Sequence, residues 1–250
     1  MFTRTHDPVQ LLQRKLEDVS DLSDSDRDSL AALSIRVVPV GADQDIVRQG
    51  DQTSQSCLLV QGLACSWKIT GKGKRQIIAF HLPGDLPDLL NLHSGVVDTA
   101  VTTLTPAKVG IILHKDLRQL FARPRLAEAL WGSLVTDAAI AREWAVNLGR
   151  REGPCRTAHL LSELMERMHS IGAVEGDSFE LPITQEVFGD AIGMSTVHVN
   201  RCLKALRRQG LISWVGGRLF ILDLEALADF GDFEDSYLHF GRRSPPAGVH

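Results

Sequence analysis

The chain has 250 residues, of which 44% are hydrophobic and 23% are charged, and its formal net charge is −4. This composition excludes a disordered chain and is typical of a globular protein with one large domain or two ordinary ones. No apolar run is long enough to span a membrane, and the first ten residues lack the hydrophobic core of a signal peptide. We therefore expect a cytoplasmic protein without a membrane partner.

The first third of the chain changes from a helical to a β-rich pattern. Residues 1–30 are polar, and "LSDSDRD" places a serine before the acidic first turn of a helix. From about Ile35, short β-rich runs alternate with glycines. "TGKGKR" predicts a hairpin turn, and Gly50, Gly62 and Gly84 are expected to end strands. Regularly spaced short strands of this kind predict a sandwich or a barrel-like roll.

The hydrophobic period becomes helical from His114. Residues 116–150, which we interpret as a single helix, contain a seven-residue repeat with alternating steps of four and three. Its members are Ala127, Trp131, Leu134, Ala138, Ala141, Ala145 and Leu148. This repeat favours a seam between two copies of the chain, because packing on one globular face does not require such strict alternation. The alternative is a helix packed on its own domain, which Ile140 and Trp144 on a neighbouring face would suit.

"GRREGPCR" then interrupts the helix with two glycines and a proline, which indicates a hinge and a domain boundary. An amphipathic helix, "TAHLLSELMERMHSIG", follows. The next stretch, "TQEVFGDAIGMSTVHVNRCLKALRRQG", has the pattern of a helix-turn-helix. After it, "SWVGGRLFIL" predicts a β-hairpin wing, and the residues beyond predict a last acidic helix.

Small and capping residues fall where a helix-turn-helix needs them. Thr184 and Ser195 are each placed to cap a helix. Gly193 lies where the sharp turn requires a left-handed backbone, and Gly189 is small where the two helices cross. We therefore expect a winged helix whose second helix presents its polar N-terminal residues.

The charges of this region are unevenly distributed. The segment from Ser195 to Arg218 contains five basic residues and no acidic one, whereas Leu219 to the end contains six acidic residues and two arginines. The five are Arg201, Lys204, Arg207, Arg208 and Arg218. A local basic element on an otherwise acidic body is typical of a site-specific DNA-binding protein.

The order of these elements resembles the Crp/Fnr family of bacterial transcription regulators. The matching stretches are "IVRQGDQ", "LLVQGL", "GKGKRQIIAFHLPGDL", "ITQEVFGDAIGMSTVHVNRCLKALRRQGLI" and "SWVGGRLFIL". The resemblance implies an α+β fold in three parts. These would be an N-terminal helix and double-stranded β-helix (the jelly roll of cyclic-nucleotide-binding domains) at residues 1–115, a dimerisation helix at 116–150, and a winged helix-turn-helix DNA-binding domain at 151–250.

The same resemblance implies a sequence-specific regulator that binds a near-palindromic operator in double-stranded DNA as a homodimer. RNA polymerase would be a further partner, and activation the expected mode. Matched position by position, or placed further along the same helix, the residues facing DNA would be Thr184, Ser195, Thr196, Val197, Asn200, Arg201, Lys204 and Arg208.

These residues would have different roles. Arg201 suits a bidentate contact to guanine, worth about 1–3 kcal/mol of discrimination. Asn200 suits adenine or a phosphate, and Lys204 and Arg208 suit phosphates. Val197 departs from the family, because many relatives carry a glutamate there that reads a base. Valine can only meet a thymine methyl group or nothing, so we expect the half-site to differ at that base.

The sensor half departs from relatives that bind cyclic AMP. Asp88-Leu89 and Asp98-Thr99 stand where those relatives have a Gly-Glu and an Arg-Ser pair, and an aspartate facing the phosphate would repel it. No cysteine precedes Cys57, so we expect no iron–sulfur cluster of the family's N-terminal type. His81 and His93 are candidate haem ligands, but we interpret them as ordinary histidines. We predict no cofactor, and a small-molecule effector remains open.

Two alternatives concern the four cysteines and the histidines. Cys57, Cys65, Cys155 and Cys202 show no CxxC spacing, which disfavours a disulfide framework or a metal finger. We interpret Cys202 as a core residue, the alternative being a redox switch that displaces the recognition helix on oxidation. A jelly-roll metal enzyme is the rival function, but His81, His93 and His114 lack the short HxH spacing of such sites.

Overall fold

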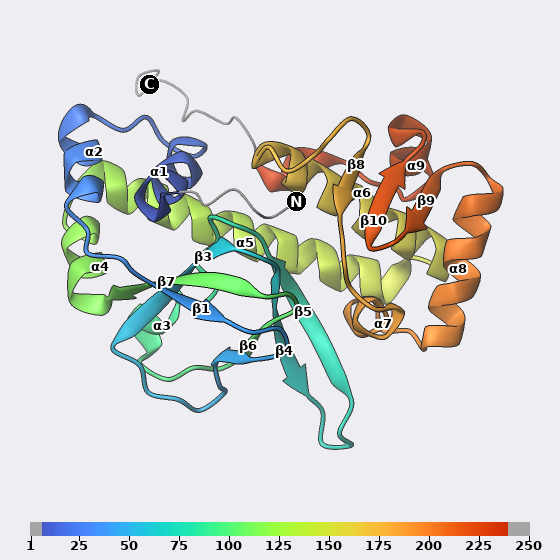
Figure 1. Cartoon of the computed structure of the whole chain (residues 1–250), viewed down its shortest axis with the longest axis horizontal. Coiled ribbons are helices and arrows are strands. Elements are labelled where there is room, and N and C mark those ends of the chain that lie inside the picture. Colours follow the sequence, from blue (N-terminus) through green and yellow to red (C-terminus); the bar gives the residue numbers. More distant parts are fainter. Residues whose placement is uncertain (1–6, 240–250) are drawn as a thin grey trace. The chain divides into compact units, whose positions relative to one another are not determined.

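The structure is a computed structural model that describes residues 7–239 of the chain (Figure 1). Two helices open it, α1 (Pro8–Glu17) and α2 (Asp24–Ala31). The Asp7 side chain caps α1 by accepting a hydrogen bond from the Val9 amide at 2.8 Å. Ser23 caps α2 in a reciprocal pairing with Asp26. The helical expectation is thus confirmed for residues 8–17 and 24–31, with a turn between them, and residues 1–6 lie outside the described part.

Seven strands follow, arranged in two sheets that form the predicted roll. They are β1 (Arg36–Val40), β2 (Asp45–Val47), β3 (Gln55–Gln61), β4 (Ala64–Ile69), β5 (Arg75–His81), β6 (Ala100–Thr103) and β7 (Ala107–Leu113). One sheet has the order β1-β7-β3 and the other β2-β6-β4-β5. Cys57, Leu59, Val101 and Val109 pack between them. The roll predicted from the glycine-punctuated runs is confirmed.

The turns of the roll depend on glycine at particular positions. Gly62 follows β3 with a φ of +98°, and a Cβ there would lie 2.8 Å from the Pro106 carbonyl oxygen. Gly73, in the predicted hairpin turn between β4 and β5, has a φ of +76°. Both positions combine a left-handed backbone with their turn, a conformation that only glycine adopts at low cost.

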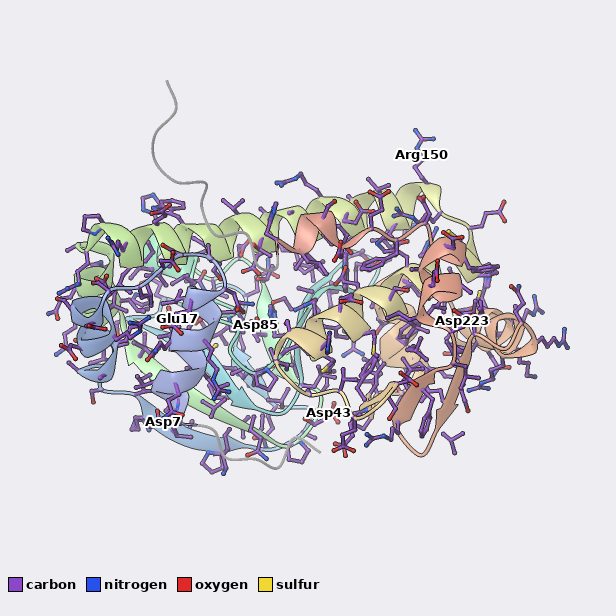
Figure 2. All side chains as sticks on the ribbon, turned by 90° about the horizontal axis from the view of Figure 1, so that it is seen from above. Asp7, Glu17, Asp43, Asp85, Arg150 and Asp223 are labelled. Atoms are coloured by element: carbon purple, nitrogen blue, oxygen red, sulfur yellow. The ribbon has the colours of Figure 1, made fainter. Side chains whose placement is uncertain are left out.

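The helical segment after the roll is divided where we expected one helix. Its first helix is α4 (His114–Phe121), which follows β7. A separate short helix, α3 (Asn91–Ser94), lies earlier in the chain, between β5 and β6. The long α5 begins at Pro124 and runs to Arg150, so the single helix predicted over residues 116–150 is wrong at its start. Proline has no amide hydrogen and its ring clashes with the preceding turn, so it ends α4 and opens α5. Figure 2 shows Arg150 extending away from the end of α5.

The C-terminal elements form the predicted winged helix with one additional strand. They are α6 (Gly153–Ser170), β8 (Ser178–Glu180), α7 (Gln185–Ile192), α8 (Thr196–Arg208), β9 (Ile212–Val215), β10 (Arg218–Ile221), α9 (Leu224–Phe230) and the 3₁₀ turn Asp235–Leu238. The wing hairpin and the last helix are confirmed. The sequence did not indicate β8, which pairs with β10 to give the order β8-β10-β9.

The described residues form two compact units. One unit comprises Trp67–Phe80 and Ile140–Tyr237, and the other comprises residues 7–66, His81–Ala139 and 238–239. The hairpin at Trp67–Phe80 therefore groups with the winged helix. Within that unit Arg75 pairs with Asp190 at 2.7 Å.

Candidate nucleic-acid interface

The α7–α8 turn has the geometry that its residues predicted. Thr184 caps α7, its Oγ1 accepting from the Val187 amide at 3.2 Å. Gly193 follows α7 in the left-handed region, with a φ of +66°. A Cβ on Gly189 would lie 2.5 Å from the Met194 carbonyl oxygen, so the close approach of the two helices needs a glycine there. These expectations from the sequence are confirmed.

The second helix, α8, is capped by Ser195, whose hydroxyl accepts from the His198 amide at 3.4 Å. Its inner face is a buried apolar stripe. The stripe consists of Val199, Cys202, Leu203 and Leu206. On α7, Phe188 is fully buried and meets Trp214 of β9 edge-on, with ring centroids 5.6 Å apart. The stripe and this aromatic pair hold α7, α8 and the wing together as one packed body.

The outer face of α8 gathers the predicted DNA-facing residues. Val197 is 64% exposed on this face. Around it the exposed residues of the predicted set are Ser195, Thr196, Arg201, Lys204 and Arg208. Thr184 is exposed at the start of α7, and Asn200 is partly buried at the edge between the two helices. The structure thus brings all eight predicted residues to α8 and the adjoining end of α7.

The five basic residues of this region divide into two groups. Arg207 donates to the Trp214 carbonyl at 3.2 Å, and Arg218 pairs with Glu175 at 2.7 Å, so both serve the fold. Within residues 7–239, Arg201, Lys204 and Arg208 form no ion pair with an acidic side chain. Three cations on one helix face therefore remain available to a polyanion.

One residue of this surface escaped the sequence analysis. The Nδ2 group of Asn200 donates to Oε1 of Gln185, the first residue of α7, at 3.3 Å. The two residues are 15 positions apart, and only the crossing of α7 and α8 brings them together. No local pattern could have indicated the pair.

The break between α5 and α6, predicted as a hinge, is densely hydrogen-bonded. Arg156 donates to the Ile192 carbonyl at 2.9 Å and to the Arg151 carbonyl at 2.9 Å. Arg151 in turn pairs with Glu143 at 2.7 Å and with Asp232 at 3.0 Å. These contacts tie the start of α6 to the end of α7, and the residues just before α6 to the turn after α9.

The roll places its two predicted aspartates differently. Asp88 is buried, and its Oδ1 accepts from the Cys57 amide at 2.8 Å. Burial raises the pKa of Asp88 to about 6. Asp98 is exposed on the rim of a groove of about 580 Å³. The groove is mostly apolar, and Trp131 and Leu134 of α5 form part of its wall.

The remaining candidate residues lie in ordinary packing environments. His81 contacts the Ser66 hydroxyl at 2.7 Å, and His93 is exposed. His114 is buried beside Ser56 at 3.1 Å. Cys202 is 2% exposed, and burial raises the pKa of its thiol, which disfavours the reactive thiolate.

Within residues 7–239, no group of three or more His, Cys, Asp or Glu side chains comes close enough together to hold a metal ion. No helix in this part of the chain has both the length and the apolar character needed to cross a membrane.

Comparison with known proteins gives two family matches. Residues 37–124 match the cyclic nucleotide-binding domain, and residues 155–230 match the Crp-like helix-turn-helix domain. The first covers most of the roll and α4. The second covers α6 through α9, including the whole candidate interface.

Individual relatives are similar over most of their length. The transcriptional activator protein FnrL of Cereibacter sphaeroides is 27% identical over 203 residues, which cover 79% of this chain and 81% of the relative. The nitrogen fixation regulation protein FixK of Bradyrhizobium diazoefficiens is 28% identical over 200 residues, covering 77% and 82%. The solved structure of FixK2 from Bradyrhizobium japonicum superposes with a TM-score of 0.71 at 25% identity, covering 79% of this chain and 98% of that one.

Proposed function

Because the chain belongs to the Crp/Fnr family of DNA-binding transcription regulators, we propose that it binds a near-palindromic operator as a homodimer, with α8 of each copy in the major groove. The observation that carries this proposal is the outer face of α8. It combines three cations that have no acidic partner in the described chain with short polar residues and an exposed valine, on a helix fixed at both its cap and its inner face.

The dimer is supported by the exposure of the predicted seam on α5. Trp131 is 60% exposed, and Ala138, Ala141 and Ala145 are exposed, whereas Ile140 and Trp144 on the neighbouring face are 7% and 5% exposed. Ala127, Leu134 and Leu148 are partly buried. A helix that packs one apolar face on its own chain and leaves a seven-residue repeat open is suited to a second copy.

The apolar groove supports the same partner. Its walls include Trp131 and Leu134, which belong to the repeat, and Leu90, which is 65% exposed. A groove continuous with the seam would be covered when two α5 helices pair, and this buries apolar area that one copy leaves in water. We therefore assign the groove to the second copy rather than to an effector.

Each interface residue has a chemical role in the proposal. Arg201 makes the bidentate contact to guanine, and Val197 contacts a thymine methyl group. Lys204 and Arg208 neutralise phosphates. Ser195, Thr196 and Thr184 lie at helix starts, where short polar groups donate to the DNA backbone. Two-fold symmetry would set the two α8 helices about 34 Å apart, one turn of DNA.

We further infer that the regulator activates transcription and contacts RNA polymerase. Support comes from relatives, since FnrL of Cereibacter sphaeroides and anr of Pseudomonas aeruginosa are both transcriptional activator proteins by name. A bound activator acts through the polymerase at the promoter, so this partner follows from the mode of action.

Cyclic AMP and an iron–sulfur cluster do not enter the proposal. The Oδ1 atom of Asp88 already accepts a hydrogen bond from the Cys57 amide inside the roll. The carboxylate of Asp98 would repel the phosphate of a cyclic nucleotide. A [4Fe–4S] cluster needs four ligands, usually thiolates. Cys57 and Cys65 are buried in the core of the roll and Cys202 is buried in the winged helix, so these thiols fill packing positions within their own units.

The test is selection of binding sites from random duplex DNA by the full chain. We expect an enriched inverted repeat whose half-sites contain a guanine that Arg201→Ala no longer selects. Enrichment of no sequence, or equal affinity for every duplex, would remove the regulator proposal.

A further inference from the structure

The amide pair of Gln185 and Asn200 joins the two helices at the edge of the candidate interface. Asn200 lies about 60° around α8 from Val197, since each residue advances about 100°. It is therefore on the border between the exposed face and α7, and both amides are partly buried. The contact runs from Nδ2 of Asn200 to Oε1 of Gln185, at 3.3 Å.

This contact restricts what Asn200 can present. A free asparagine amide rotates broadly about its last torsion, so either its oxygen or its NH₂ group can face a base. With one N–H committed to Gln185, the amide retains one N–H donor and the adjacent Oδ1 acceptor. Adenine offers the complementary pair on its major-groove edge, an N7 acceptor and an N6 donor.

The side-chain NH₂ group of Gln185 takes no part in the contact with Asn200. Its Oε1 accepts from Asn200, while its Nε2 carries two further donors beside the start of α7. A phosphate oxygen of the DNA backbone is the acceptor that suits a side-chain amide at this position. One side chain could then contact the backbone with its nitrogen and orient a base-reading residue with its oxygen.

We propose that Gln185 is a positioning residue that fixes the amide of Asn200 and thereby makes the protein select adenine at the base that Asn200 meets. The inference rests on the proposed function, because it concerns the same helix in the same groove. Its new content is that base selection at this position depends on a residue of α7.

Three variants distinguish the carbonyl acceptor of Gln185, its NH₂ donors and the side chain of Asn200. Gln185→Leu removes both the acceptor and the donors with little change in size. Gln185→Glu keeps an acceptor for the Asn200 N–H but loses the donors and adds a charge that phosphates repel. Asn200→Ala removes the reader itself. Glu186→Gln is the matched control, since Glu186 is exposed one position further along α7.

The experiment measures affinities of the full-length variants for the selected operator and for duplexes changed at each half-site base. Asn200→Ala should flatten a preference of about tenfold at one base pair. Gln185→Leu should reduce the base preference at the same position severalfold. When Gln185→Leu is combined with Asn200→Ala, the double variant should lose no more of this preference than Asn200→Ala alone. Gln185→Glu should lose affinity for all duplexes while keeping the preference, and Glu186→Gln should leave the preference unchanged.

Two results would overturn the inference while leaving the proposed function intact. One is a Gln185→Leu protein that keeps the full preference for adenine while its thermal midpoint shows that it is folded. The other is a flattening that adds independently to that of Asn200→Ala. If the unmodified chain prefers no sequence at all, the proposed function fails and the inference fails with it.

Discussion

Arg201 and Lys204 are three residues apart on α8 and carry the same charge, but their side chains differ in geometry. The guanidinium of Arg201 is planar and can match the two acceptors of guanine, whereas the ammonium of Lys204 is a compact point charge. Both are exposed and neither has an acidic partner among the described residues. Arg201 is therefore suited to reading a base, and Lys204 to anchoring the DNA backbone.

This difference predicts two kinds of loss. Arg201→Ala should weaken binding to the selected operator by about ten- to a hundredfold and relax the preference at one guanine. Lys204→Ala should weaken binding to all duplexes alike and reduce the slope of log affinity against log salt by about 1. Fluorescence anisotropy at several salt concentrations measures both, and identical effects of the two variants would contradict the assignment.

Asp88 gives a prediction about pH. Burial raises its pKa to about 6 in the folded chain, against an ordinary value of 3.8, so between these values the folded state binds a proton that the unfolded state has released. Stability from this group is therefore present below about pH 4 and is lost as the pH rises to about 6.

We expect the unmodified chain to lose stability relative to Asp88→Asn, by up to about 3 kcal/mol, as the pH rises from 4 to 6. Asparagine does not titrate, and its side-chain oxygen can still accept from the Cys57 amide. Chemical unfolding of both proteins across this range is the measurement. Parallel pH profiles would show that Asp88 titrates at its ordinary value.

The helix caps and the turn glycine could be predicted from sequence because each depends on neighbours within a few residues. Thr184, Ser195 and Gly193 all lie where their residue types indicated. The contact of Gln185 with Asn200 could not be predicted, since it depends on a helix crossing that brings together two residues 15 positions apart.

At the scale of elements, the crossing of α7 over the start of α8 depends on the absence of a side chain at Gly189. A Cβ there would lie 2.5 Å from the Met194 carbonyl oxygen and 3.3 Å from a methyl of Val199. The nearer neighbour is backbone, so relief requires the turn itself to shift. The orientation of the candidate reading helix is thus coupled to one glycine.

Gly189→Ala should destabilise the winged helix by about 1–3 kcal/mol. Gly149→Ala is the matched control, because Gly149 is helical and a Cβ there meets nothing within 4 Å. The control should leave stability unchanged or raise it by up to about 1 kcal/mol through helix propensity. Thermal unfolding compares them, and equal midpoints would show that the turn accommodates a side chain.

One helix boundary and one strand were missed, for different physical reasons. The seven-residue repeat spans Ala127–Leu148, entirely inside α5, so extending that helix back to residue 116 overlooked the break at Pro124. Strand β8 has three residues and no alternating pattern of its own. It forms because β10 offers an edge, and pairing of this kind is a tertiary effect.

At the scale of the whole molecule, the account requires two copies joined along α5. Ala141 is exposed on the repeat, whereas Arg150 lies off it at the end of the helix, where Figure 2 shows it extending outward. Alanines on a seam let two backbones approach closely, so a charged side chain there would be buried without a partner.

Ala141→Glu should convert the dimer to a monomer and abolish tight binding to the full operator, because each half-site alone provides only part of the contacts. Arg150→Ala should remain a dimer. Sedimentation velocity reports the association state of both. A monomeric unmodified chain, or an unaffected Ala141→Glu dimer, would place the seam elsewhere.

Sequence order and periodicity were sufficient to predict the roll, the long helix and the winged helix, because each has a recognisable pattern within its own residues. The grouping of the Trp67–Phe80 hairpin with the winged helix had no such pattern. It depends on contacts such as Arg75 with Asp190, which are 115 residues apart in the chain.

In the proposed complex, two α8 helices related by two-fold symmetry contact successive turns on one face of the DNA. Affinity for duplexes carrying the selected inverted half-sites at graded separations tests it most directly. We expect maximal affinity when the half-site centres are about 10 base pairs apart, and a sharp loss of affinity after insertion of half a turn. Affinity that does not depend on the separation would contradict it.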